Sequence, residues 1–210
     1  MQTRHVSTGT HGRFLYEARD PARLLVGFHG YAENAERHWK ELQQIPGNDA
    51  WSLAAVQALH PFYVRNSEEV VANWMTSQDR ELAIADNIDY VRNVLATLPR
   101  PEKLVFLGFS QGVATAFRVT ADFAWRCHGI IALGGDVPPD VAQEGVHLPP
   151  ALLARGKSDD RYTDEKFEKD LKFLRGATHV TTCVFDGGHE WSDEFREAAG
   201  RFLERMKDEG

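Results

Sequence analysis

The sequence has little cysteine: 2 residues in 210, Cys127 and Cys183. They lie outside any Cys-x-x-Cys spacing, and two isolated thiols in a chain without a secretion signal are typical of reduced, buried side chains. His189-Glu190 begins like a zinc-protease motif, but position 193 is Asp where a second His is needed. We therefore expect neither a disulfide framework nor a metal site.

An excess of basic residues is also absent. The 24 Lys and Arg residues are outnumbered by 31 Asp and Glu, which gives a formal net charge of −7. Nucleic-acid binding depends on basic side chains that neutralise phosphates, so the sequence disfavours it. No segment approaches the ~20 apolar residues of a membrane span, and residues 1–5 lack the apolar run of a signal peptide. We expect a cytoplasmic protein without a membrane span.

Hydrophobic residues make up 42% of the chain and charged residues 26%, the balance of a folded globular protein. No repeat, low-complexity tract or linker divides the sequence, and its length suits one core. We expect a single domain over 1–210. The sequence does not indicate whether it is a monomer or a homodimer.

Short apolar runs alternate with helical patterns along the chain. The runs predict strands at 24–28, 53–58, 104–107, 130–133, 151–154 and 180–185, with an early strand at 14–16. Helical spacing of apolar residues appears at Ile84, Ile88, Val91 and Leu95, and again at Phe195, Ala199, Phe202 and Met206. The pair Thr76 and Asp79 resembles a capping box before the first of these helices, and residues 111–123, rich in alanine, predict a closely packed helix. This alternation favours an α/β fold with a mostly parallel central sheet and helices on both faces.

The segment Gly108-Phe109-Ser110-Gln111-Gly112 follows the strand at 104–107 and opens a helix. A G-x-S-x-G pattern between a strand and a helix is typical of a nucleophile elbow. The glycines allow a sharp turn that lifts the serine hydroxyl clear of the sheet, and the helix N-terminus favours developing negative charge. We therefore expect Ser110 to be a nucleophile.

A nucleophilic serine needs a base and an acid that orients the base. Asp159 and Asp160 follow the strand at 151–154, and His189 follows the strand at 180–185 after a Gly-Gly pair. The order Ser, acid, His is that of an α/β-hydrolase triad. For the oxyanion hole, the main-chain N–H of Gln111 follows the nucleophile, and that of Tyr31 follows the first core strand.

Together these motifs resemble the phospholipase/carboxylesterase family of α/β-hydrolases, which includes acyl-protein thioesterases. The resemblance is carried by Phe28-His29-Gly30, the serine pentapeptide, Gly156-x-x-Asp159 and Gly188-His189, and extends from residue 24 onward. It implies a triad of Ser110, Asp159 and His189, because the family's acid stands three residues after the glycine. The family often has Leu where this chain has Tyr31, and an apolar or proline-containing stretch where it has residues 160–163.

The substrate pocket is less well defined by the sequence. Phe62, Tyr63, Trp74 and Trp191 are candidates to line an acyl site, and simple core packing is the alternative for each. Residues 134–150 are the only room for a cap and are too short and too rich in proline and glycine for a large helical lid. We expect a minimal lid or none, and an open site.

The candidate residues and the family resemblance both indicate ester hydrolysis by a nucleophilic serine. We expect hydrolysis of a small-molecule carboxylic ester through an acyl-Ser110 intermediate without a cofactor, with thioesters and lysophospholipids as further substrate candidates. An acyltransferase or perhydrolase could use the same triad, and a non-catalytic binding protein could retain the fold. The sequence does not separate an ester from a thioester substrate, nor give the acyl chain length.

Overall fold

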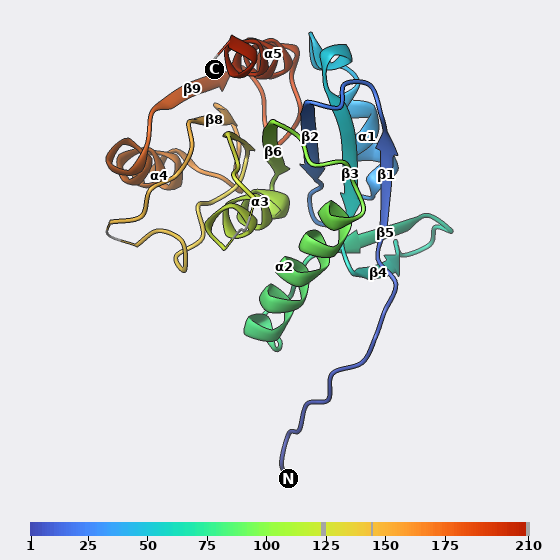
Figure 1. The fold of residues 1–210 in the computed structure, drawn as a ribbon. Coiled ribbons are helices and arrows are strands. Elements are labelled where there is room, and N and C mark those ends of the chain that lie inside the picture. The colour runs from blue at the N-terminus through green and yellow to red at the C-terminus, as the bar shows by residue number, and fades with distance from the viewer. Residues whose placement is uncertain (123–124, 144, 209–210) are drawn as a thin grey trace.

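The computed structural model describes residues 1–122, 125–143 and 145–208 (Figure 1). Its strands are β1 Arg13–Glu17, β2 Arg23–Phe28, β3 Ser52–Gln57, β4 His60–Tyr63, β5 Val70–Asn73, β6 Lys103–Phe109, β7 Gly129–Leu133, β8 Ala151–Gly156 and β9 Val180–Phe185. Its helices are α1 Ala35–Leu42, the 3-10 turn η1 Asn48–Ala50, α2 Arg80–Ala96, α3 Gln111–Ala121, α4 Asp164–Ala177 and α5 Asp193–Asp208.

Seven strands form one sheet in the order β1-β3-β2-β6-β7-β8-β9. The strand β1 pairs with β3 in antiparallel orientation, and all other neighbours in this sheet are parallel. Each of the seven strands expected from the sequence is present, with ends shifted by at most two residues. The mostly parallel sheet is therefore confirmed.

Helices cover both faces of the sheet, as Figure 1 shows. Val26 and Phe106 belong to the apolar cluster that includes residues of α2, α3 and α4. Leu25 and Val105, their neighbours along the strands, belong to the cluster that includes residues of α1 and α5. Because both faces are buried, the central strands are continuous apolar runs rather than alternating ones.

A two-stranded antiparallel hairpin, β4–β5, lies outside the main sheet and was not expected. Pro61 lies within β4, and proline is tolerated there because the strand has a partner on one side only. A single bridge between Glu33 and Ala72 joins β5 to the loop that follows β2. The hairpin therefore holds residues 74–75 close to the end of β2.

The expected capping box before α2 is wrong. The Thr76 Oγ1 atom accepts from the Gln78 N–H at 3.2 Å and does not reach the helix. Asp79 is the N-cap residue, but its φ is 49° and its side chain makes no capping hydrogen bond. Its carboxylate instead lies 2.9 Å from Nε2 of His5. The first turn of α2 therefore lacks a side-chain cap.

The other expected helices are present. Phe195, Ala199, Phe202 and Met206 are all buried in α5. The helix expected over 111–123 runs from 111 to 121, and residue 123 lies outside the described residues. The described part of 134–150 contains no helix or strand, as expected for a minimal lid. No helix in the described part of the chain is long and apolar enough to cross a bilayer.

Candidate active site

Ser110 lies at the carboxyl end of β6, directly before α3. Its φ of 52° is unusual for a residue with a Cβ, and its N–H donates to the Leu133 carbonyl at 2.8 Å. A Cβ on Gly108 would lie 2.5 Å from the Gly112 carbonyl oxygen, and one on Gly112 would lie 2.0 Å from the Phe28 oxygen. Main-chain atoms leave no room at either position, so both glycines are needed for this turn.

The side chains of Ser110, His189 and Asp159 come from separate loops and lie in series. The Nε2 atom of His189 lies 2.8 Å from Ser110 Oγ, and its Nδ1 atom lies 2.8 Å from Asp159 Oδ2. All three residues follow carboxyl ends of strands, β6, β8 and β9, which meet at one edge of a parallel sheet. The arrangement provides a hydroxyl, an imidazole and a carboxylate connected in series, as in a Ser-His-Asp triad.

The structure places Asp159, and not Asp160, at the imidazole. Asp159 is 4% exposed, and its second oxygen accepts from the N–H groups of Arg161 and Tyr162 at 2.9 and 2.8 Å. Asp160 is exposed. Three hydrogen bonds therefore fix the orientation of the Asp159 carboxylate. Gly134 makes room for the pair, because a Cβ there would lie 3.2 Å from His189. No pattern in the sequence indicates this role of Gly134.

The loop after β2 is held by its own buried histidine. Nε2 of His29 accepts from the Ala58 N–H at 3.0 Å, so Nδ1 carries the proton and donates to the Gly30 carbonyl at 2.6 Å. Burial lowers the pKa of His29 to about 4, which keeps the ring neutral. The Trp74 indole N–H donates to the His29 carbonyl at 2.8 Å. These bonds fix the main chain that leads to Tyr31.

The two N–H groups expected for the oxyanion hole belong to Tyr31 and to Gln111, which directly follows Ser110. Gly30 lies beside Ser110, since a Cβ on Gly30 would be 3.3 Å from the Ser110 Cβ, and Tyr31 follows in the chain. Within the described part of the chain, neither the Tyr31 nor the Gln111 N–H has a hydrogen-bond partner. Both N–H groups are therefore free to donate to an oxyanion, which needs two such donors.

Two supporting side-chain roles, those of Gln111 and Glu33, were missed by sequence reasoning. The Gln111 side chain accepts from the Trp74 N–H at 2.9 Å and donates to the Met75 carbonyl at 2.8 Å. Glu33 accepts from the Gly30 N–H at 2.7 Å, and burial raises the pKa of its carboxyl despite that bond. Both side chains bind main-chain groups, a role that residue type alone does not reveal.

The four candidate pocket residues have different surroundings. Trp74 is fully buried against Phe28 and His29, so it does not line an open site, and the interpretation of it as a pocket residue is corrected. Trp191 packs on Phe109 in the cluster that includes α1 and α5.

The other two candidates lie on the hairpin. Phe62 is half-buried, with its ring centroid 5.7 Å from that of Tyr31. Tyr63 is 69% exposed. Of the four, Phe62 is therefore the one whose ring lies against Tyr31.

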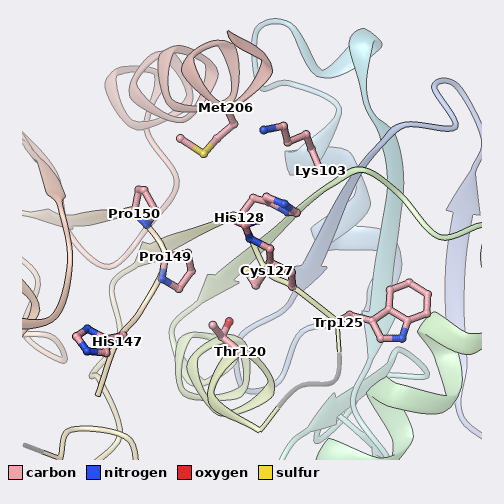
Figure 2. Close-up of a pocket in the computed structure, with 10 residues that line it drawn as sticks. Lys103, Thr120, Trp125, Cys127, His128, His147, Pro149, Pro150 and Met206 are labelled. Atoms are coloured by element: carbon pink, nitrogen blue, oxygen red, sulfur yellow. The ribbon is translucent and has the colours of Figure 1, made fainter. Parts of the chain in front are cut away.

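A cavity of about 330 Å³ opens beside Ser110, between α3 and residues 134–136 and 161–166. A larger cavity of about 540 Å³ lies at the amino ends of β6, β7 and β8, at the opposite edge of the sheet. Figure 2 shows Lys103, Cys127 and His128 around it. Burial raises the pKa of the Cys127 thiol to about 11, which makes it a poor nucleophile. The smaller cavity is therefore the one next to reactive groups.

Comparison with solved structures places this geometry in a known fold. The esterase PE8 structure superposes with a TM-score of 0.75 at 21% identity, over 93% of this chain and 98% of that one. The chain has the α/β-hydrolase fold. The chain also resembles acyl-protein thioesterase 2 of Zea mays, with a TM-score of 0.71 at 18% identity over 93% and 99% of the two chains. A phospholipase/carboxylesterase of Dyadobacter fermentans gives 0.71 at 19% over 95% and 99%. The sequence matches no family model and no curated protein.

Proposed function

We propose that this α/β-hydrolase chain is a serine hydrolase that cleaves carboxylic esters or thioesters through an acyl-Ser110 intermediate. The observation that carries the proposal is the connected series Ser110, His189 and Asp159, with both contacts at 2.8 Å. The similarity in fold to an esterase and a thioesterase supports the same class of reaction.

In the first half-reaction His189 Nε2 takes the proton from Ser110 Oγ as the oxygen attacks the substrate carbonyl carbon. Negative charge then develops on the carbonyl oxygen, where the N–H groups of Tyr31 and Gln111 stabilise it. The Asp159 carboxylate holds Nδ1–H of His189 and stabilises the imidazolium. The same proton passes to the leaving oxygen or sulfur as its bond to the acyl carbon breaks.

In the second half-reaction water replaces the alcohol or thiol. His189 takes a proton from the water, whose oxygen attacks the acyl carbon of the ester on Ser110. Collapse of this intermediate returns the proton to Ser110 Oγ and releases the carboxylic acid. The overall reaction consumes ester and water and requires no electron acceptor or donor.

The experiment compares initial rates on p-nitrophenyl esters of increasing chain length, a lysophospholipid and an acyl thioester. We expect turnover of the short esters by the wild type and loss of nearly all turnover in Ser110→Ala. Product analysis with a competing alcohol and hydrogen peroxide present separates hydrolysis from the alternatives. Free acid should dominate; a transferred ester or a peracid as the main product would contradict hydrolysis, and no turnover by the folded protein would favour a binding role.

A further inference from the structure

The cavity beside Ser110 is lined by basic side chains. Four of its lining residues are basic and one is acidic: Arg80, Arg118, Arg161 and Lys166, with Asp136. The chain as a whole has a formal net charge of −7. The charge next to the nucleophile is therefore opposite in sign to that of the whole chain.

Two of the four basic groups already have acidic partners. Arg118 is 3% exposed and donates two hydrogen bonds to Asp140, at 2.7 and 2.8 Å. Lys166 lies 3.6 Å from Asp136 and also donates to the Arg161 carbonyl at 2.8 Å. Their charges are largely compensated within the protein, so these two groups shape the wall of the cavity more than its net charge.

The other two, Arg80 and Arg161, form no ion pair with any residue that the structure describes. Arg80 is exposed in the first turn of α2, where the helix dipole disfavours a cation. Arg161 is exposed, and its N–H donates to the triad carboxylate of Asp159 at 2.9 Å. Both arginines line the cavity that Ser110 also lines. Arg80 lies near enough to Asp140 to help lower the pKa of that carboxyl, and Arg161 is tied through its main chain to Asp159.

We propose that this cavity binds an anionic group of the substrate, so that the preferred ester or thioester carries a carboxylate or phosphate in addition to its scissile bond. The proposal rests on the hydrolase function proposed above. Guanidinium groups match the planar carboxylate and the phosphate because they donate two parallel hydrogen bonds. A cleft of one charge also attracts ligands of the other, which makes binding sensitive to salt.

The kinetic test compares a charged and a neutral ester of similar length, mono-p-nitrophenyl glutarate and p-nitrophenyl valerate. At low ionic strength we expect kcat/KM for the glutarate to exceed that for the valerate by about tenfold, the size of one charge-assisted hydrogen bond. Arg80→Gln and Arg161→Gln should each reduce this ratio about three- to tenfold. Arg175→Gln, exposed in the last turn of α4, removes the same charge away from the cavity and should leave the ratio unchanged.

A binding test that needs no turnover uses the Ser110→Ala protein. We expect calorimetry to detect glutarate binding that weakens with added salt and is lost when Arg80→Gln and Arg161→Gln are combined. Inorganic phosphate in a parallel titration distinguishes the two anions: tighter binding of phosphate would assign the cavity to a phosphate-bearing substrate, and tighter binding of glutarate to a carboxylate.

The outcomes separate this inference from the proposed function. One outcome is Ser110-dependent turnover of the valerate, a ratio of glutarate to valerate kcat/KM near one, and no anion binding. It would overturn the inference and leave the hydrolase function intact. Anion binding with no turnover of either ester would overturn the hydrolase function and retain an anion site. The glutarate-to-valerate ratio of kcat/KM could also exceed one and fall as much in Arg175→Gln as in Arg80→Gln and Arg161→Gln. That result would attribute the preference to the overall charge of the protein and overturn the inference.

Discussion

The Nε2 atom of His189 lies 2.8 Å from Ser110 Oγ, although 79 residues separate them in the chain. The strands that carry them, β6 and β9, are not neighbours, because β7 and β8 lie between them in the sheet. Three strand spacings amount to ~14 Å. The histidine loop therefore has to reach back over the ends of the intervening strands.

The path of that loop depends on Gly156 at the end of β8. A Cβ on Gly156 would lie 2.2 Å from the Gly188 carbonyl oxygen and 2.4 Å from that of Gly187. We expect Gly156→Ala to displace His189 and to lower kcat about 10²-fold or more, since errors of about 1 Å in catalytic geometry have effects of this size. Initial rates on a short p-nitrophenyl ester measure this.

The matched control is Gly176→Ala in α4, where an added Cβ meets nothing within 4 Å. This variant should keep full activity and, because alanine favours helix, should be as stable as the wild type or more so by up to ~1 kcal/mol. Equal activity of Gly156→Ala and wild type would show that the loop is not held at this position.

The adjacent carboxylates Asp159 and Asp160 provide a direct comparison. Asp159→Asn should lower kcat by about 10⁴-fold, because an amide cannot hold the imidazole in its required tautomer as a carboxylate does. Asp160→Asn removes the same charge from an exposed side chain and should change kcat less than about threefold. Similar losses in the two variants would contradict the assignment of Asp159.

The backbone conformation of Ser110 predicts a difference in stability between two variants that both lack the hydroxyl, Ser110→Gly and Ser110→Ala. At a φ of 52°, a residue with a Cβ is strained by about 1–3 kcal/mol. Ser110→Gly relieves this strain but adds ~0.5–1 kcal/mol of chain entropy to the unfolded state. We therefore expect Ser110→Gly to be more stable than Ser110→Ala by ~1 kcal/mol in urea denaturation.

Ala114→Gly in α3 is the control for that comparison. In a helix the same exchange of alanine for glycine should destabilise the protein by ~1 kcal/mol. If glycine lowered the free energy of unfolding equally at 110 and at 114, the Ser110 backbone would not be strained.

His38 predicts a pH dependence of stability. It is 1% exposed, and neither ring nitrogen has a hydrogen-bond partner among the residues that the structure describes. Burial lowers its pKa from 6.5 to about 3. Below pH 6.5 the unfolded chain takes up a proton at His38 that the folded protein does not. The free energy of unfolding should therefore fall on acidification from pH 6.5 toward 3, by ~1.4 kcal/mol per pH unit from this residue.

The His38→Leu variant isolates this contribution from that of other groups. Urea denaturation of both proteins at pH 7, 6 and 5 should show that the variant loses less stability than the wild type, by ~2 kcal/mol at the lowest of these pH values. Parallel pH curves for the two proteins would show that His38 is protonated in the folded state as readily as in the unfolded chain.

Sequence reasoning succeeded where local pattern and strand order act together. The inner strands β2, β3, β6, β7 and β8 are buried apolar runs, and Ser110 and Asp159 each follow one of them. The strands at the sheet edges, β1 and β9, are partly exposed, and His189 follows β9. Parallel strands end at one edge of the sheet, so these residues were expected to meet. The hairpin β4–β5 was missed because each of its strands is only 4 residues long and β4 contains Pro61.

Local sequence patterns do not predict which side chains are buried, or which residues distant in the sequence line the same cavity. Trp74 is a large aromatic residue of the kind that often lines a pocket. In the structure its indole N–H donates to the His29 carbonyl inside the core. Arg80 and Arg161 are 81 positions apart in the sequence. They line one cavity because the start of α2 and the loop after β8 both lie near α3. Neither fact follows from residue type or periodicity.

The central claim, that Ser110 is a nucleophile activated by His189, is tested most directly by covalent labelling. A fluorophosphonate is incubated with wild type, Ser110→Ala and His189→Ala, and the adducts are located by peptide mass spectrometry. We expect one adduct per wild-type molecule on Ser110, none in Ser110→Ala and a much slower reaction in His189→Ala. Folded wild-type protein that remains unlabelled, or that is labelled at a residue other than Ser110, would contradict this claim.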